Sequence, residues 1–388
     1  MTASRKTRTG SPPMAIWKAL LLSLPVFLIT GLLPLGALES GDLPNIVAIL
    51  IMWLGFNVVF VLMLTTGQTH RYRSVLFILY AVALPVWFIP MMIETQGSIM
   101  LSEEAIVGAE ASFCPLATFM VIVPAVVKRF VIFPGALVGG LGFATAALMW
   151  AGSTLALGRG WCSWGCLFGG WDELFSRLRK KAVIKKVDRR WIYLPFGLLL
   201  AIVLLSAVTL GPIYCEWLCP FKIVTEFQAP SSLLAIIQIS IFVVLFFALV
   251  VVLPLLTRRR IQCGLFCPFG ALQSLLNKIN VFEVRIDPEK CSQCRRCIRE
   301  CPTFSLNEGS LESGKPLITC TKCARCIDVC PKNAISFHIK GTSLQASPAV
   351  ARVLYLYPGF VLLFFWSSGS VAGALHRIVK LITTGSMI

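Results

Sequence analysis

Seven long apolar runs dominate the sequence and restrict the chain to folds that a lipid bilayer can accommodate. A membrane-spanning helix needs about 20 mostly apolar residues. The runs show no sustained strand alternation and are too long for the strands of a membrane barrel. They predict an all-α polytopic membrane bundle of about seven spans, at 15–37, 44–66, 75–97, 131–157, 191–213, 232–257 and 350–372.

An eighth apolar stretch, 113–127, contains Pro115 and Pro124 and is short for a full crossing, so we interpret it as a re-entrant or tilted segment. Charged residues make up only 14% of the chain, against roughly a quarter in soluble proteins. This composition excludes an ordinary water-soluble enzyme. With three histidines and no C-x-x-C-H motif, the sequence also argues against bound haem.

Basic residues in the short loops predict the orientation, because cytoplasmic loops are enriched in Lys and Arg. The loop 177–190 has eight Lys or Arg residues and one acid. The N-terminus, this loop and residues 258–349 are therefore predicted on the cytoplasmic side of a bacterial-type inner membrane, provided that 113–127 does not cross. Lys128 and Arg129 argue against that condition. The first span also resembles a signal peptide, and we interpret it as an uncleaved anchor.

One polar insert, residues 285–340, interrupts the apolar pattern and contains the pattern C-x-x-C-x-x-C-x-x-x-C-P twice. In two-cluster ferredoxins, the fourth cysteine of each such run binds the other cluster. The spacing therefore predicts two 4Fe–4S clusters in an α+β ferredoxin-like domain. Their ligands would be Cys291, Cys294, Cys297 and Cys330 for the first cluster, and Cys320, Cys323, Cys326 and Cys301 for the second.

Zinc also binds four thiolates, but eight cysteines in this doubled, proline-terminated spacing favour iron–sulfur clusters. A disulfide framework is disfavoured because we assign the insert to the reducing cytoplasm. The basic residues Arg295, Arg296, Arg299, Lys322 and Arg325 lie between these cysteines. They are explained either by charge at a membrane surface or by docking of an acidic redox partner.

Three further cysteine pairs have the spacing C-x-x-x-C and lie at the ends of apolar runs. Residues four apart share one face of a helix, so each pair offers two thiolates, half of a cluster site. The hairpin of spans 191–213 and 232–257 predicts that its flanking pairs meet. They would form a third cluster site at the cytoplasmic membrane edge, from Cys162, Cys166, Cys263 and Cys267. The alternatives are structural thiols or two separate metal sites.

The third pair, Cys215 and Cys219, is predicted at the other end of this hairpin, on the outer side with Cys114. Three interpretations stay open for these cysteines. They could hold a fourth cluster with one non-cysteine ligand, form a redox-active Cys215–Cys219 disulfide in an oxidising compartment, or serve as structural thiols.

At these motifs the chain resembles the NapH/NosR/CcoG-type membrane iron–sulfur proteins, called polyferredoxin-like, and most closely the NapH type. The resemblance covers roughly residues 155–340 and rests on Arg159 before Cys162, on Arg260 before Cys263, and on the double ferredoxin motif. Leu167 departs from the proline that the family has after the second cysteine. The resemblance implies electron exchange with quinol or with periplasmic reductases and their maturation.

We therefore expect four regions: an N-terminal membrane region 1–157, a hairpin with C-x-x-x-C motifs 158–284, the double 4Fe–4S domain 285–340, and a C-terminal membrane helix 341–388. The predicted function is electron transfer between the clusters of a cytoplasmic ferredoxin module and a quinone or a membrane or periplasmic partner, with no role for nucleic acid. Two alternatives are a transmembrane thiol–disulfide conduit through Cys215 and Cys219, and a redox-sensing maturation or regulatory factor. Whether the chain is itself an enzyme is left open, as are the direction of electron flow and the oligomeric state.

Overall fold

The computed structural model describes residues 11, 13–38, 43–95, 143–185, 187–209, 213–225, 232–343 and 347–386. Six helices in this part of the chain are long and apolar enough to cross a membrane, and six of the seven predicted spans correspond to them. They cover Ile16–Gly36, Leu43–Thr66, Thr69–Pro90, Arg190–Thr209, Leu233–Thr257 and Pro348–Thr384.

Of the remaining predicted span, 131–157, the structure describes helix α6 (Phe143–Leu157). The predicted re-entrant segment 113–127 and Cys114 lie outside the described residues. The described residues divide into two compact units. The first unit comprises Met1–Trp87, Leu155–Trp171 and Gln273–Ile388, and the second comprises Phe88–Thr154 and Asp172–Leu272. These units cut across the four regions expected from the sequence, because the ferredoxin segment packs with the first helices and the last one.

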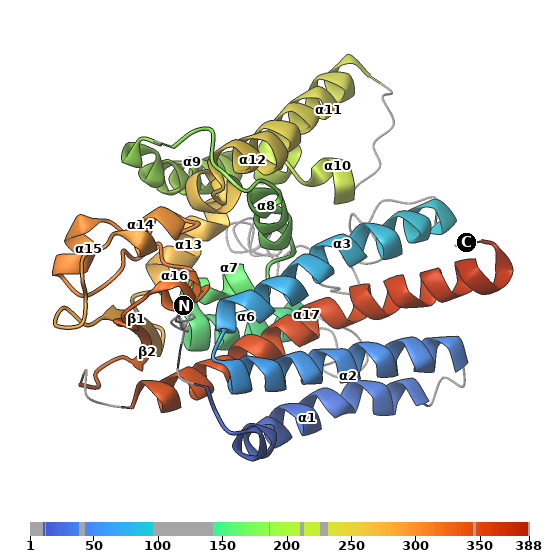
Figure 1. The fold of residues 1–388 in the computed structure, drawn as a ribbon. Coiled ribbons are helices and arrows are strands. Elements are labelled where there is room, and N and C mark those ends of the chain that lie inside the picture. The colour runs from blue at the N-terminus through green and yellow to red at the C-terminus, as the bar shows by residue number, and fades with distance from the viewer. Residues whose placement is uncertain are drawn as a thin grey trace, which may run out of the picture. The chain divides into compact units, whose positions relative to one another are not determined.

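Four long helices form the membrane part of the first unit: α1 (Ile16–Leu38), α2 (Leu43–Thr66), α3 (Thr69–Thr95) and α17 (Pro348–Thr384). Figure 1 shows them running alongside one another, and α2 packs against both α1 and α17. Aromatic rings fill the contact between α2 and α17, with 4.7 Å between the ring centres of Phe60 and Phe360. Leu28 and Leu32 of α1 stay 70% and 69% exposed, as expected of side chains that face lipid.

Hydrogen bonds show which ends of these helices lie together. The Met14 backbone N–H donates to the Thr65 carbonyl oxygen (3.2 Å), and Arg352 Nε donates to Thr69 Oγ1 (3.0 Å). The start of α1, the end of α2, the start of α3 and the start of α17 therefore share one end of the first unit. This arrangement agrees with the predicted alternation of the first spans; which side of the membrane this end faces stays a prediction.

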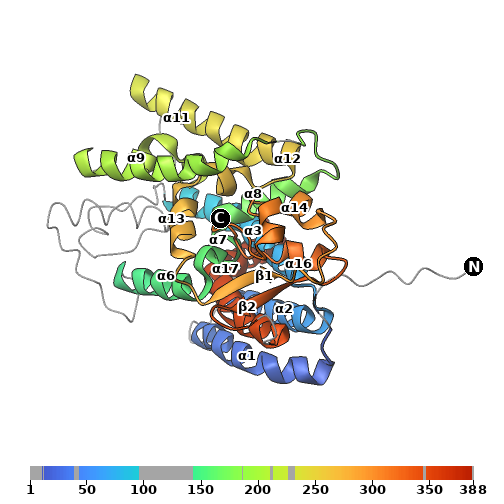
Figure 2. The same cartoon turned by 90° about the vertical axis from the view of Figure 1, so that its left-hand side faces the viewer.

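The ferredoxin segment of the first unit contains a two-stranded antiparallel sheet, β1 (Phe282–Ile286) and β2 (Ile335–Ile339), in which Phe282 pairs with Ile339. Phe282, Val284 and Ile286 alternate with half-buried residues and point to the buried side of the sheet. Three short helices accompany it: α14 (Arg296–Glu300), α15 (Glu308–Glu312) and α16 (Arg325–Val329). Figure 2 shows the two strands side by side, with α16 next to β2.

The segments with the C-x-x-x-C pairs are built from short turns between longer helices. Around the first pair lie η1 (Gly158–Gly160), α7 (Trp161–Trp164) and α8 (Leu167–Leu178). In order along the chain, the later elements are η2 (Arg189–Tyr193), α9 (Leu194–Thr209), η3 (Tyr214–Leu218), α10 (Lys222–Thr225), α11 (Leu233–Leu245), η4 (Phe246–Val252), α12 (Leu253–Thr257), η5 (Gln262–Phe266) and α13 (Pro268–Leu276).

In the second unit, α11, η4 and α12 follow one another without a break and form the apolar span Leu233–Thr257. The segment after Cys219 folds back along this span. The ring centres of Phe221 and Phe246 are 6.2 Å apart, and Lys222 Nζ lies 5.6 Å from the centre of the Phe242 ring. The connection within the hairpin is therefore packed against the middle of a spanning helix.

Candidate iron–sulfur sites

The two cysteine runs of the ferredoxin segment have the same backbone, offset by 29 residues. Gln293 and Arg295 adopt left-handed conformations (φ 51° and 57°), and so do their counterparts Lys322 and Ala324 (φ 49° and 64°). Left-handed backbone is disfavoured for residues with a Cβ atom, so its recurrence at equivalent positions marks an internal repeat. These bends curl the chain so that successive cysteines face a common space.

Each curled loop borders a small cavity. The structure gathers around them the same two sets of four cysteines that the spacing predicts. The first cavity is lined by Cys291, Cys294, Cys297 and Cys330, and the second by Cys301, Cys320, Cys323 and Cys326. Each set takes its fourth thiol from the other run.

The surroundings of these thiols fit an iron–sulfur cluster. The Ser305 N–H donates to Cys301 Sγ and the Ala334 N–H to Cys330 Sγ, both at 3.3 Å, which is again a symmetric pair. Such bonds to sulfur stabilise a ligated thiolate. Burial raises the pKa of Cys297 to about 11 and that of Cys320 to about 12, so these thiols need a bound metal to become thiolates near neutral pH.

Among the described residues, no three His, Cys, Asp or Glu side chains converge closely enough to hold a single metal ion. In each cavity four thiols are present together, which is the number of ligands that one 4Fe–4S cluster takes. The assignment of individual ligands to clusters stays a prediction.

The two equivalent loops differ sharply in exposure. Residues 292–296 of the first loop are all exposed, whereas residues 321–325 of the second loop are all buried. Because the backbones match, the difference arises from what covers the second loop. In the first unit this cover consists of the start of α3, the segment 157–164 and the first turns of α17.

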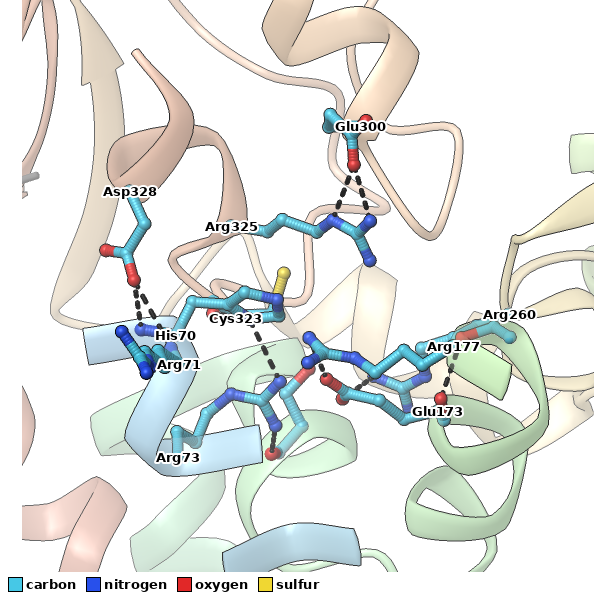
Figure 3. Close-up of polar contacts among 12 residues, drawn as sticks. His70, Arg71, Arg73, Glu173, Arg177, Arg260, Glu300, Cys323, Arg325 and Asp328 are labelled. Atoms are coloured by element: carbon cyan, nitrogen blue, oxygen red, sulfur yellow. Dashed lines mark hydrogen bonds and ion pairs between the residues drawn. The ribbon is translucent and has the colours of Figure 1, made fainter. Parts of the chain in front are cut away.

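The start of α3 contacts the second loop through polar groups (Figure 3). His70 Nδ1 lies 3.0 Å from the Cys323 carbonyl oxygen. Asp328 Oδ2 accepts hydrogen bonds from the backbone N–H groups of His70 (2.9 Å) and Arg71 (3.2 Å). A carboxylate at the first N–H groups of a helix caps them and complements the helix dipole. The ferredoxin segment thus supplies the cap for a membrane helix.

Lys322, within the second loop, contacts the segment that carries the first C-x-x-x-C pair. Its Nζ donates to the Leu157 carbonyl oxygen (2.9 Å) and to Asn277 Oδ1. Burial lowers the pKa of Lys322 to about 7; Lys340 adds to that shift, and the Cys320, Glu283 and Cys162 side chains oppose it. The Cys162 thiol is therefore an electrostatic neighbour of the Lys322 amine.

Tyr355 of α17 joins the same two segments. Its hydroxyl donates to the Lys322 carbonyl oxygen (3.0 Å) and accepts from Trp164 Nε1 (3.0 Å). Trp164 lies between Cys162 and Cys166 in the sequence, and both Trp164 and Cys162 are buried. The first C-x-x-x-C pair and the second ferredoxin loop are thus joined through one tyrosine.

In the second unit, the other two C-x-x-x-C pairs share a local fold. The first cysteine of each pair lies in a π-helical turn, η3 or η5, and the second follows it in extended backbone before a proline. Cys219 has φ −78° and ψ 110°, and Cys267 has φ −72° and ψ 115°. A residue before proline is driven out of the helical region, so the C-P dipeptide ends each turn at its second thiol.

These two pairs lie together around Tyr214. Gln262 Nε2 donates to the Tyr214 hydroxyl (3.4 Å). The pKa of Tyr214 is raised, first by burial and then by the thiols of Cys267, Cys219 and Cys215. The prediction that Cys215 and Cys219 lie at the opposite end of the hairpin from Cys263 and Cys267 is therefore wrong, because the connecting segment folds back along the spanning helix.

A buried ionic group supports Cys263 in the second unit. Arg260 Nη2 donates to Cys263 Sγ (3.2 Å), and the Cys263 N–H donates to Asp172 Oδ2 (2.8 Å). Glu173 lies 3.9 Å from Arg260 and 2.9 Å from Arg177 (Figure 3). Burial raises the pKa of Asp172 to about 7, although Arg260 opposes the shift. In the sequence, Arg260 stands out only as part of the family motif, and no local pattern points to Asp172 or Glu173.

Cys162 and Cys166 belong to the first unit and Cys263 and Cys267 to the second. The predicted third site, which combines these four, stays a prediction.

Comparison with known families identifies two kinds of domain. A 4Fe–4S binding domain matches three times, at residues 138–186, 191–231 and 239–286. A 4Fe–4S dicluster domain matches residues 283–331. Each of the first three matches contains one C-x-x-x-C pair, and the last contains the eight ferredoxin cysteines.

Several relatives among curated proteins are named for electron transport or as ferredoxin-type proteins. The chain is 27% identical over 160 residues to the putative electron transport protein YccM of Escherichia coli, covering 39% of this chain and 43% of YccM. It is 28% identical over 152 residues to the ferredoxin-type protein NapH of Escherichia coli, covering 38% of this chain and 49% of NapH. It is 29% identical over 174 residues to the methylamine utilization ferredoxin-type protein MauN of Methylorubrum extorquens, covering 43% of this chain and 55% of MauN.

The matched segments span about half the length of these relatives. No solved structure matches the chain. With its apolar helices and its 4Fe–4S domains, the chain is a membrane iron–sulfur protein. Within that class it is similar to NapH-type, polyferredoxin-like proteins, which confirms the predicted resemblance.

Proposed function

We propose that this protein carries electrons between a soluble redox partner and a redox site at its membrane helices, through two 4Fe–4S clusters bound by the eight ferredoxin cysteines. One observation carries the proposal: two loops with the same backbone have opposite surroundings. Residues 292–296 are exposed, whereas residues 321–325 are buried under the start of α3, the segment 157–164 and the first turns of α17. A 4Fe–4S cluster, when bound, accepts and returns single electrons.

The exposed loop suits an acidic partner protein. Four basic residues lie in or next to it, and Arg295 and Lys290 keep 65% and 66% of their side chains exposed while pairing with Glu308 and Asp287. Charge complementarity of this kind accelerates the encounter of redox partners. We assign this end to the cytoplasm, where a reduced one-electron carrier is the expected donor or acceptor.

The covered loop leads to the first C-x-x-x-C pair. Lys322 and Tyr355 tie the loop to the segment that carries Cys162 and Trp164, so groups that exchange electrons at these two places have a short, rigid contact. The final partner on the membrane side is proposed to be a quinone or a second membrane or periplasmic protein.

We also infer a third cluster site in the second unit, formed by Cys215, Cys219, Cys263 and Cys267. The thiols of Cys215, Cys219 and Cys267 lie around Tyr214, and Arg260 donates to Cys263. An Arg–thiolate hydrogen bond stabilises the anionic form that a metal requires. In the site predicted from the sequence, Cys263 and Cys267 are combined with Cys162 and Cys166. In the site inferred here, they are combined with Cys215 and Cys219.

Iron and sulfide content of anaerobically purified protein tests the proposal, together with electron paramagnetic resonance (EPR) of the reduced sample. We expect at least eight irons per chain, two ferredoxin-type signals, and separate loss of one signal each in Cys294→Ser and Cys323→Ser. Reduction by an acidic carrier protein should slow as ionic strength rises. A chain without iron, or one that binds zinc instead, would refute the electron-transfer function.

A further inference from the structure

We propose that Lys322 gives the cluster site of Cys301, Cys320, Cys323 and Cys326 a higher reduction potential than the site of Cys291, Cys294, Cys297 and Cys330, so that electrons move from the exposed loop toward the membrane helices. This inference rests on the proposed function and adds a direction to it.

The internal repeat isolates the effect of this one residue. Lys322 corresponds to Gln293, and both residues adopt left-handed backbone between the first two cysteines of their loops. Gln293 is exposed, whereas only 4% of the Lys322 surface is accessible. Since the first loop adopts the same conformation with an uncharged residue, the loop itself does not require the lysine.

The contacts of the Lys322 amine suit a positive charge. Its Nζ donates to two acceptors, the Leu157 carbonyl oxygen and Asn277 Oδ1. Lys322 lines the cavity of the second site and lies between the ligand positions Cys320 and Cys323, so its charge is close to a bound cluster. Charge interactions between buried groups are only weakly screened by salt.

A reduced cluster carries one more negative charge than an oxidised one, so a buried cation beside it stabilises the reduced form. Burial alone acts in the opposite sense, because it disfavours added charge. Among the basic residues of the second loop, Arg325 pairs with Glu300 (2.5 Å), which offsets its charge. Lys322 lies between the ligand positions Cys320 and Cys323 and donates to neutral oxygens only, so its charge acts against the cost of burial at this site.

The first loop carries its charge in a different setting. In the first loop, Arg295 occupies the position that Ala324 has in the second loop. The Arg295 guanidinium is exposed and lies 3.2 Å from the Glu308 carboxylate. An exposed ion pair is screened by water and salt and has little effect on a nearby potential. The two sites thus have similar ligands and different electrostatic surroundings.

Redox titration monitored by EPR tests the inference on the full-length protein. The neutral variant Lys322→Gln carries the residue found at the equivalent position of the other loop. We expect the potential of the second cluster to fall by at least 59 mV, a tenfold change in the ratio of reduced to oxidised cluster, with the first cluster unchanged. The matched variant Gln293→Lys adds an exposed charge and should shift the first cluster by much less.

A second variant, Lys322→Arg, keeps the positive charge and should keep the potential of the second cluster. The order of the two potentials in the unmodified protein tests the inference even if Lys322→Gln loses its cluster. The Cys294→Ser and Cys323→Ser spectra assign the two signals. Absence of both clusters in the unmodified protein would refute the proposed function itself. Two intact clusters whose potentials do not change in Lys322→Gln, or a second cluster with the lower potential in the unmodified protein, would overturn the inference alone.

Discussion

At the scale of single residues, Asn277 has a dense set of contacts between the segments of the first unit. Its Oδ1 accepts from the Arg159 N–H (3.0 Å) and from Lys322 Nζ. Its Nδ2 donates to the carbonyl oxygens of Ile318 (2.7 Å) and Cys320 (3.0 Å). One amide group thus holds the second cysteine loop against the segment that leads to Cys162.

Asn277→Ala should therefore destabilise the protein. Removing the amide leaves four backbone or side-chain groups without this partner, and net losses of about 1 kcal/mol per hydrogen bond predict a cost of about 2–4 kcal/mol. Thermal unfolding in detergent checks the value, and we expect the second cluster to be lost at a lower temperature than the first. The neighbouring variant Lys278→Ala is the control. Equal melting temperatures for the two variants would contradict this role.

At the scale of elements, α17 is both a membrane helix and a support for the ferredoxin segment. With 37 residues it is about 55 Å long, whereas the hydrocarbon core measures about 30 Å. Its first turns extend to β2, where the Tyr355 and Phe337 rings stack with 4.2 Å between their centres. Further along, Trp164 packs directly on Gly359, where an added Cβ would lie 3.0 Å from the indole.

Two glycines of α17 give a matched test of this packing. Gly359→Ala should loosen the contact with Trp164 and cost about 1–3 kcal/mol, the usual penalty for overpacking. Gly369 lies in the same helix, and a Cβ added there would have open space within 4 Å, so Gly369→Ala should be neutral or slightly stabilising. Melting temperatures of both variants in one detergent decide the matter. A smaller loss for Gly359→Ala than for Gly369→Ala would show that the indole contact is unimportant.

The elements also show what the sequence can predict. Span positions and the doubled cysteine motif depend on local composition and spacing, and the sequence is sufficient for both. The start of α3 at Thr69, rather than near residue 75, does not follow from the sequence, because the polar residues His70 and Arg73 are buried against other segments of the first unit instead of facing water. The folding back of residues 214–225 depends on tertiary contacts such as Phe221 with Phe246, which no local pattern contains.

At the scale of the whole molecule, three C-x-x-x-C pairs follow one another along the chain, each within its own 4Fe–4S domain match. The signal of this repeat is present in the sequence, because each second cysteine is followed two positions later by a phenylalanine, Phe168, Phe221 or Phe269. Counting the spans in the sequence nevertheless predicts that the middle pair and the last pair lie at opposite ends of the hairpin. The shared π-helical turns of these two pairs show that they are equivalent units.

Iron content of three double variants decides which pairs share a cluster. The site inferred in the second unit predicts that Cys215→Ser/Cys219→Ser and Cys263→Ser/Cys267→Ser each lose the same cluster, about four irons per chain, whereas Cys162→Ser/Cys166→Ser retains it. The pairing predicted from the sequence instead requires that Cys162→Ser/Cys166→Ser and Cys263→Ser/Cys267→Ser each lose this cluster. In that case Cys215→Ser/Cys219→Ser retains it.

A third outcome identifies the thiol–disulfide conduit. In that case Cys215→Ser/Cys219→Ser keeps all of its iron, and the unmodified protein forms a mixed disulfide with a partner that this variant does not form. The two cluster pairings can be distinguished without knowing the partner, because iron and acid-labile sulfide are counted on the purified chain. Since Arg260 donates to Cys263 Sγ, Arg260→Gln should weaken whichever cluster Cys263 binds. Arg177→Gln, whose side chain contacts Glu173 at 2.9 Å, is the control for loss of a positive charge.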